Sequence, residues 1–275
     1  MASQSSPIHI RALGEINELK AVEELQQEVW GCSEREILPA LAMVPLLEIG
    51  GVLLGAFDRG VLIGFVLGFP GFEGGKPILH SDMLAVRSAY RSSGLGYQLK
   101  LAQRDFALAR QVPKITWTFD PLQSANAHLN FGKLGVIADR YKINYYGETS
   151  SLLHRTGTDR LWVTWLLESE RVKQRIEDNE VPSLPEEDLP VLLRCDQDGE
   201  PVMSAIDETA PLTTIEIPRD INLILEADAG RAMRWREATR AAFTSAMATN
   251  YFVSDFFRDS SERRMTGMYL LRQTN

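Results

Sequence analysis

Residues 84–96 read LAVRSAYRSSGLG and join an apolar segment to a pattern typical of a helix. Where a strand enters a helix through a glycine-rich turn, unpaired backbone N–H groups and the helix dipole together favour a bound anion. Gly94 and Gly96 lack a Cβ, so an anion can approach the backbone closely. The stretch therefore predicts a phosphate-binding turn. An ordinary helix start, capped by Ser92 or Ser93, stays open at this point.

Length and composition limit the class of protein. The chain has 275 residues, 44% of them hydrophobic, which suffices for one large domain or for one domain with a smaller appendage. Its net charge of -8 argues against general binding to nucleic acids or anionic membranes. Cys32 and Cys195 have neither metal-site nor redox spacing, so we expect a reduced, cytoplasmic protein without a metal. Prolines and a glutamate interrupt the longest apolar stretch, residues 37–57, which predicts neither export nor a membrane span.

The segments before the turn alternate between patterns of strand and helix. Apolar residues recur at three- and four-residue steps after residue 15, and two apolar runs flank Asp58-Arg59-Gly60, a typical hairpin turn. In chain order, the expected elements are a strand at residues 8–13, a helix at 15–30, paired strands at 50–57 and 61–69, a glycine-rich loop at 70–77 and a strand at 78–86.

The helix after the turn carries one apolar stripe, so we expect it to pack on a sheet and to end before Pro113. On this interpretation Lys100, Gln103 and Arg104 face away from the sheet. The stripe consists of Leu95, Leu99, Ala102, Phe106 and Ala109.

Further elements follow this helix. The expected elements are a strand at 115–119, a helix at 124–134 stopped by Gly135, strands at 136–146 and 161–167, a strand at 213–217, a helix around 232–246 and a hairpin of strands at 251–257 and 265–271. Residues 177–188 are acidic and rich in proline. We therefore expect a catalytic domain at residues 1–170, a linker at 171–190 and a C-terminal α+β extension at 191–275.

The turn excludes two familiar nucleotide motifs. A P-loop requires Gly-Lys-Ser/Thr after its glycines, and a dinucleotide fingerprint requires a third glycine where Leu99 stands. The run Arg91-Ser92-Ser93-Gly94-Leu95-Gly96 instead resembles the Q/R-x-x-G-x-G/A motif of the GNAT acetyltransferase superfamily. Residues 8–167 also have the element order of that superfamily, and residues 115–135 and 159–167 resemble a predicted-acetyltransferase branch with a C-terminal extension.

This resemblance implies the fold and the donor substrate. The implied fold class is α/β (α+β), a mixed and mostly antiparallel sheet flanked by helices, with a smaller C-terminal α+β segment. Acetyl-CoA would lie where two parallel strands splay apart, and backbone N–H groups would hold its thioester carbonyl and later the oxyanion. The implied cofactor-binding residues are Leu84, Ala85, Val86, Arg91, Ser92, Ser93, Gly94, Leu95, Gly96, Asn126 and Lys133, with Arg87 and Lys100 as further cationic candidates.

Acetyl transfer to an amine requires a base, because an alkylammonium has a pKa of about 10. Glu73, His80, Asp82 and Asp120 are the candidates near strand ends and loops. His80 and Asp82 share one face if their segment is a regular strand, and we prefer them as the catalytic pair.

The proton donor for the leaving thiolate is less clearly indicated. In the superfamily a tyrosine on the helix pattern L-Y-x-K-x-G-F often has this role, and Phe131 stands at that position here. Tyr141, Tyr145 and Tyr146 are alternative donors, of which we choose Tyr141, and unassisted departure also stays open. Ser124 replaces a common asparagine, and the nearby Asn126 and His128 are candidates to face CoA.

The sequence thus predicts an acetyltransferase that moves an acetyl or other acyl group from CoA to an amine of a small molecule or peptide. The attack would be direct, in a ternary complex. One alternative is a non-catalytic CoA-binding or regulatory protein, and another is a structural protein that has lost the cofactor. A homodimer is possible.

Overall fold

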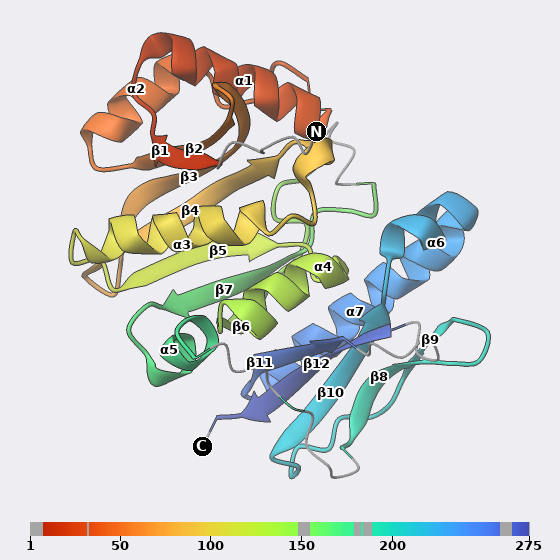
Figure 1. Cartoon of the computed structure of the whole chain (residues 1–275). Helices are drawn as coiled ribbons and strands as arrows, with labels where there is room; N and C mark the ends of the chain where they lie inside the picture. The colour runs from red at the N-terminus through yellow and green to blue at the C-terminus, as the bar shows by residue number, and fades with distance from the viewer. Residues whose placement is uncertain are drawn as a thin grey trace, which may run out of the picture. The chain divides into compact units, whose positions relative to one another are not determined.

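The computed structural model describes residues 8–31, 33–147, 155–178, 183, 189–258 and 266–274 (Figure 1). Contacts divide the chain into two compact units, one of Met1–Trp117 with Thr149–Arg155 and one of Thr118–Glu148 with Thr156–Asn275. Cys32 and most of the acidic, proline-rich segment lie outside the described residues.

Unit 1 contains the predicted turn. Its elements are β1 (His9–Ala12), α1 (Ile16–Trp30), α2 (Ala40–Glu48), β2 (Val52–Asp58), β3 (Val61–Glu73), β4 (Lys76–Val86), a 3-10 turn (Ser88–Tyr90), α3 (Leu95–Leu108) and β5 (Lys114–Phe119), whose last two residues belong to unit 2. The strands lie in the order β1-β2-β3-β4-β5. Neighbouring strands are antiparallel except β4 and β5, which are parallel, so the expected mixed sheet with one parallel pair is confirmed.

Helices cover both faces of this sheet (Figure 1). On one face, α1 and α2 pack on a core that includes Leu53, Phe65, Leu67 and Ala85. On the other face lies α3, because a Cβ added at Gly64 would stand 3.4 Å from Leu99 of that helix. The side-chain alternation of the strands thus separates an α1/α2 face from an α3 face.

Three expectations about unit 1 were wrong in detail. The segment 70–77 is not a loop, because β3 and β4 continue through it and only Gly74 and Gly75, with φ of 57° and 75°, form the turn. Helix α2 was not expected, since its Pro45 was interpreted as an interruption. The buried face of α3 is Leu95, Leu99, Lys100, Gln103 and Ala107, so Lys100 and Gln103 face the sheet.

Unit 2 joins the segment after β5 to the C-terminal part of the chain. Its elements are α4 (Ser124–Ala127), a π-helical turn (His128–Lys133), β6 (Ile137–Lys142), β7 (Arg160–Leu166), α5 (Glu170–Ile176), β8 (Val191–Cys195), β9 (Pro201–Met203), β10 (Leu212–Pro218), α6 (Ile221–Ala227), α7 (Ala229–Ala248), β11 (Tyr251–Arg258) and β12 (Thr266–Gln273). The strands lie in the order β7-β6-β11-β12-β10-β8-β9.

The C-terminal hairpin extends the sheet of unit 2. β11 pairs antiparallel with β6 at Val253 and Ala138, and α7 lies against these strands (Figure 1). Helix α5 occupies the first residues of the expected linker. The domain boundary between residues 170 and 191 stays a prediction, while contacts place the division inside β5.

Candidate functional site

The turn after β4 ends in an uncapped helix start. Gly94 is the N-cap residue of α3, with φ of 84° and ψ of 0°, and no side chain caps the helix. The Ser93 hydroxyl instead donates to the Tyr90 carbonyl at 2.7 Å, and Ser92 has a positive φ of 64°. The alternative of a serine-capped helix is therefore excluded. The first N–H groups of α3 are available to an anion from outside, as the phosphate prediction requires.

Contacts within unit 1 hold this turn in place. The Tyr90 hydroxyl donates to Asp58 at 2.6 Å, and the Arg87 backbone N–H donates to the Ile63 carbonyl at 2.9 Å. The Arg87 side chain pairs with Glu28 at 3.2 Å, whereas Arg91 is exposed. Of these two arginines, Arg91 is therefore the one whose charge is open to a ligand.

Strands β4 and β5 form a fork. They pair only at Leu79–Ile115 and at His80–Thr116, although β4 continues to Val86. Between Ser81 and Met83 the register of β4 against β3 shifts by one residue, which makes Asp82 the extra residue of a β-bulge. A bulge bends its strand and re-aims side chains, and bulges are common next to active sites. The predicted parallel pair thus does splay, and it does so in unit 1.

The strand β4 turns alternate backbone groups toward the open side of the fork. Because Arg87 bonds to β3 and antiparallel bonding alternates, Ala85 directs its N–H and C=O to β3, whereas Leu84 and Val86 direct theirs to the side of β5. Leu84 and Val86 are therefore candidates to hold a carbonyl oxygen in the fork. Ala85 is not a donor to the fork, and its side chain is buried in the α1/α2 core.

His80 and Asp82 differ in environment, because the bulge breaks the regular alternation that would place them on one face. The His80 Nδ1 lies 2.9 Å from the Thr116 hydroxyl. Burial, and after it the charge of Lys100, lowers the pKa of His80 to about 4, so the ring is a weak base. Asp82 retains an exposed surface, yet desolvation by surrounding protein raises the pKa of its carboxyl.

The other two candidate bases are engaged in ion pairs. Glu73 pairs with Lys114 at 2.5 Å, and Asp120 receives two hydrogen bonds of 2.7 Å from Arg236. Asp82 has no hydrogen bond or ion pair among the described residues. Of the three candidate carboxylates, that of Asp82 is therefore the one free to accept a proton.

A buried polar cluster lies beneath α3, where the sequence predicted only a solvent-facing side. The Lys100 side chain is 3% exposed, and its ammonium donates to the Ser81 hydroxyl at 2.7 Å and to the Gln103 amide oxygen at 3.4 Å. It also stands 3.8 Å from the centre of the Trp117 ring. Burial lowers the pKa of Lys100 to about 7.

The remaining predicted contacts to CoA lie in unit 2. Asn126 and Lys133 are exposed, on α4 and on the π-helical turn. Ser124 is buried and accepts a hydrogen bond from Arg258 at 3.3 Å. The ring of His128 packs against Gly132, where an added Cβ would lie 3.0 Å from its Nδ1. Their role toward CoA stays a prediction.

Phe131 is a core residue of unit 2. It is fully buried, with its ring centre 6.2 Å from Phe119 and 5.8 Å from Tyr269 of β12. The Tyr269 hydroxyl donates to the Pro121 carbonyl at 2.7 Å. At the position where the superfamily often has a tyrosine, this chain thus has a phenylalanine that packs against the C-terminal hairpin. Phe131 has no hydroxyl and cannot donate a proton.

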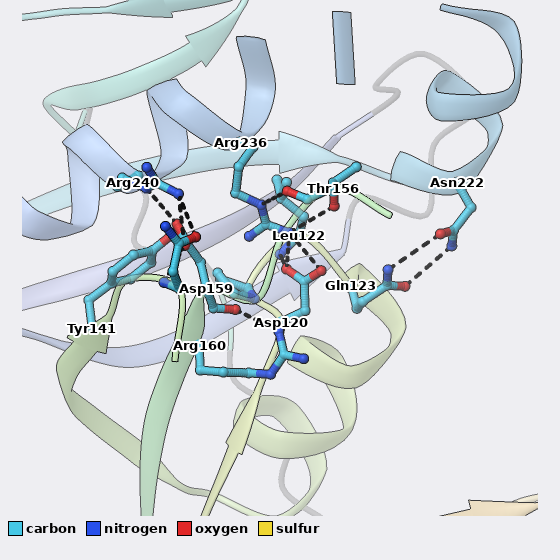
Figure 2. A network of polar contacts seen from close by, with 12 residues as sticks. Asp120, Leu122, Gln123, Tyr141, Thr156, Asp159, Arg160, Asn222, Arg236 and Arg240 are labelled. Carbon is cyan, nitrogen blue, oxygen red and sulfur yellow. Dashed lines mark hydrogen bonds and ion pairs between the residues drawn. The ribbon is translucent and has the colours of Figure 1, made fainter. Parts of the chain in front are cut away.

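Tyr141 donates its hydroxyl hydrogen to Asp159 at 2.8 Å, and Asp159 also accepts two hydrogen bonds from Arg240 (Figure 2). Burial, and after it the charge of Asp159, raises the pKa of the Tyr141 phenol. Proton donation by Tyr141 to a thiolate would require this bond to break. Tyr145 and Tyr146 are exposed, and the Tyr146 hydroxyl lies 3.1 Å from that of Thr118.

Helix α7 supplies the arginines of this network (Figure 2). Arg236 is fully buried and binds Asp120 and Thr156, and Arg240 reaches Asp159 one turn later. The Asp120 carboxylate also accepts from the Leu122 backbone N–H at 3.0 Å. Asp120 is therefore an anchor for α7 within unit 2.

A hollow of about 290 Å³ beside α1 contains the Arg11–Glu18 ion pair and shares no lining residue with the fork. No group of three or more His, Cys, Asp or Glu side chains in the described ranges is arranged to hold a metal ion. No helix in this part of the chain is long and apolar enough to cross a membrane.

Comparisons with known proteins bear on the same residues. The family model for the Acetyltransferase (GNAT) family matches residues 19–135, which include the turn and the fork. The ribosomal-protein-S18-alanine N-acetyltransferase from Escherichia coli is 17% identical, with a TM-score of 0.47 over 59% of this chain and 96% of that chain. A putative acetyltransferase from Salmonella typhimurium, with its cofactor acetyl-CoA, is 16% identical, with a TM-score of 0.47 over 60% and 96%. No curated protein sequence matches significantly.

Proposed function

We propose that the protein transfers an acyl group from acyl-CoA to an amine, because residues 19–135 match the family model of the GNAT acetyltransferases. The observation that carries the proposal is the continuity of two features in unit 1. The uncapped start of α3 offers N–H groups to a pyrophosphate, and the β4–β5 fork begins on the strand that leads into it.

In this proposal the fork binds the thioester. The backbone N–H groups of Leu84 and Val86 donate to the carbonyl oxygen and to the oxyanion that forms from it, a contribution that is often the largest in acyl transfer. The amine nitrogen forms a bond to the carbonyl carbon, and the C–S bond then breaks. The products are an amide and CoA, with the proton of the amine transferred in the end to the thiolate.

We assign the base to Asp82. Its carboxylate is exposed, has no partner among the described residues and stands on the bulge beside the fork, and the raised pKa brings it closer to the pH at which a base works best. His80, whose pKa is about 4, would contribute as a hydrogen-bonding group to Thr116. For the thiolate, the ordinary thiol pKa of about 8.5 supports departure without a dedicated acid.

The test is calorimetric titration of the full chain with acetyl-CoA, followed by release of free CoA over a panel of amines. Gly94→Glu should reduce the affinity by at least tenfold, because it adds bulk and negative charge where the pyrophosphate binds. Gly75→Glu is the matched control, since Gly75 also has a positive φ and open space around it but lies on the β3–β4 turn. Equal affinities of the two variants would contradict the assignment of the turn.

The buried Phe131 supports a second candidate, a CoA-binding protein without catalysis. Binding of acetyl-CoA without release of CoA on any amine would favour this candidate. Absence of binding to any acyl-CoA would overturn both and leave a fold without its cofactor.

A further inference from the structure

Lys100 stands at the vertex of the β4–β5 fork. The last pair of the ladder is His80–Thr116, and the next residues on the two strands are Ser81 and Trp117. The Lys100 ammonium contacts both of these next residues, at 2.7 Å from the Ser81 hydroxyl and 3.8 Å from the centre of the Trp117 ring. The cation thus occupies the point at which the two strands separate.

The contacts of Lys100 are all uncharged among the residues that the structure describes. Its contacts are a hydroxyl, an amide oxygen and an aromatic ring, and no carboxylate in the described residues pairs with it. A buried cation costs free energy unless it is paired, so buried charges are normally matched. Burial, and after it the charge of this ammonium, lowers the pKa of His80 to about 4. When Lys100 is protonated, the vertex therefore carries a positive charge that no carboxylate of the described residues matches.

A second donor beside Lys100 also lacks an acceptor. Gln103 is fully buried, and its amide oxygen faces the ammonium. Its amide nitrogen, Nε2, has no hydrogen-bond partner. Gly68 leaves room for this group, because a Cβ there would lie 3.1 Å from the nitrogen. An ammonium and an amide N–H that both lack an anionic acceptor form a pair of donors suited to a carboxylate.

The vertex lies at the end of the fork remote from the anion-binding turn. Ser81 precedes Leu84, the nearer of the two proposed carbonyl donors, by three residues on β4, about 10 Å at the usual rise of a strand. A donor whose pyrophosphate binds at the start of α3 and whose arm follows the fork would therefore direct its acyl end toward Lys100. An uncharged acetyl group offers nothing to these donors, whereas an acyl group that ends in a carboxylate does.

We propose that the preferred donor is the CoA thioester of a dicarboxylic acid, such as succinyl-CoA, whose free carboxylate is bound by Lys100 and Gln103. This inference rests on the proposed function and names its donor class. The reaction is unchanged: the amine forms a C–N bond to the thioester carbon, the C–S bond breaks, and CoA leaves with the proton. The distal carboxylate keeps its charge and forms no covalent bond.

The experiment compares succinyl-CoA with butyryl-CoA, which have four acyl carbons each and differ by a carboxylate in place of a methyl group. Affinities are measured by calorimetry on the full chain, so the readout does not depend on the acceptor amine. Because a hydrogen bond to a charged group is stronger than a neutral one, the wild type should bind succinyl-CoA roughly tenfold to a hundredfold more tightly.

Variants identify the groups responsible. Lys100→Met should abolish the preference while binding of butyryl-CoA is retained, and Gln103→Leu should reduce the preference. Lys20→Met, which removes an exposed lysine of α1, should leave it unchanged. Equal affinity of the wild type for both thioesters, or a preference that survives Lys100→Met, would overturn the inference and leave acyl transfer intact. Failure to bind any thioester would overturn the proposed function itself.

Discussion

Replacement of Lys100 by methionine should make the protein more stable at neutral pH. Burial lowers the pKa of Lys100 from 10.5 to about 7, and the side chain is too buried for solvent to screen this effect. Each pKa unit corresponds to about 1.4 kcal/mol, so the buried amine costs about 5 kcal/mol at pH 7 and below. The variant also leaves the Ser81 hydroxyl without its partner, at about 1–3 kcal/mol. We expect a net gain of roughly 2–4 kcal/mol in the free energy of unfolding.

The sign of the pH dependence follows from linkage. Between pH 7 and 10.5 the unfolded chain binds a proton at Lys100 that the folded chain does not, so the stability of the wild type rises with pH in this window. At pH 10 less than about 1 kcal/mol of the cost remains. The advantage of the variant should therefore disappear between pH 7 and pH 10.

Guanidinium unfolding at both pH values, followed by tryptophan fluorescence, measures this difference, since Trp117 contacts the ammonium. Lys20→Met is the control, because an exposed substitution on α1 should change stability by less than about 0.5 kcal/mol. A Lys100→Met variant that is less stable than the wild type at pH 7, or equally affected at both pH values, would refute the reasoning. Such a result would mean that Lys100 is a satisfied part of the core.

Three further substitutions test the other assignments. Asp82→Asn should lower kcat/KM about 10²–10⁴-fold. It should also remove the acid limb of the pH–rate profile, which lies above the ordinary Asp pKa because desolvation raises the pKa of this carboxyl. An unchanged pH–rate profile would remove Asp82 from the mechanism. Phe131→Tyr should not speed CoA release and should cost about 1–3 kcal/mol in denaturation, because its new hydroxyl enters a fully buried site; a faster reaction would mean that this position reaches the thiolate. Asp120→Asn should destabilise unit 2 by about 3–5 kcal/mol by leaving Arg236 with an unpaired buried charge, and a loss of activity at full stability would restore Asp120 as a base.

The sequence predicts most of the elements of unit 1 because local signals are strong there. The hairpin around Gly60 and the helix after Gly94 are each marked by a glycine with positive φ. Helix α2 was missed because Pro45 interrupts the pattern, although the helix continues through it. The pairing of β6 with β11 joins residues more than a hundred positions apart, and no local pattern specifies such a contact.

The geometry of the candidate site could be predicted where it depends on backbone conformation, and not where it depends on tertiary packing. The turn at residues 91–96 follows from glycine and helix-end chemistry. The bulge at Asp82 has no such local mark, and it changes which side chains share a face. The predicted orientation of α3 was wrong. Lys100 and Gln103 lower the hydrophobicity of the face that is buried, so the apolar periodicity indicates the neighbouring face as the buried one.

That misassigned face is itself informative about function. A core position under a helix is stabilised by an apolar side chain, and here two polar residues, Lys100 and Gln103, occupy adjacent turns of α3 at a cost in stability. Local rules are most often broken at functional sites, where the cost is offset by binding or catalysis. A ligand that supplies the missing anion would restore the ammonium's charge and raise its pKa again. Donor binding would then be coupled to uptake of a proton by Lys100 near neutral pH, whereas an uncharged acyl group would produce no such uptake.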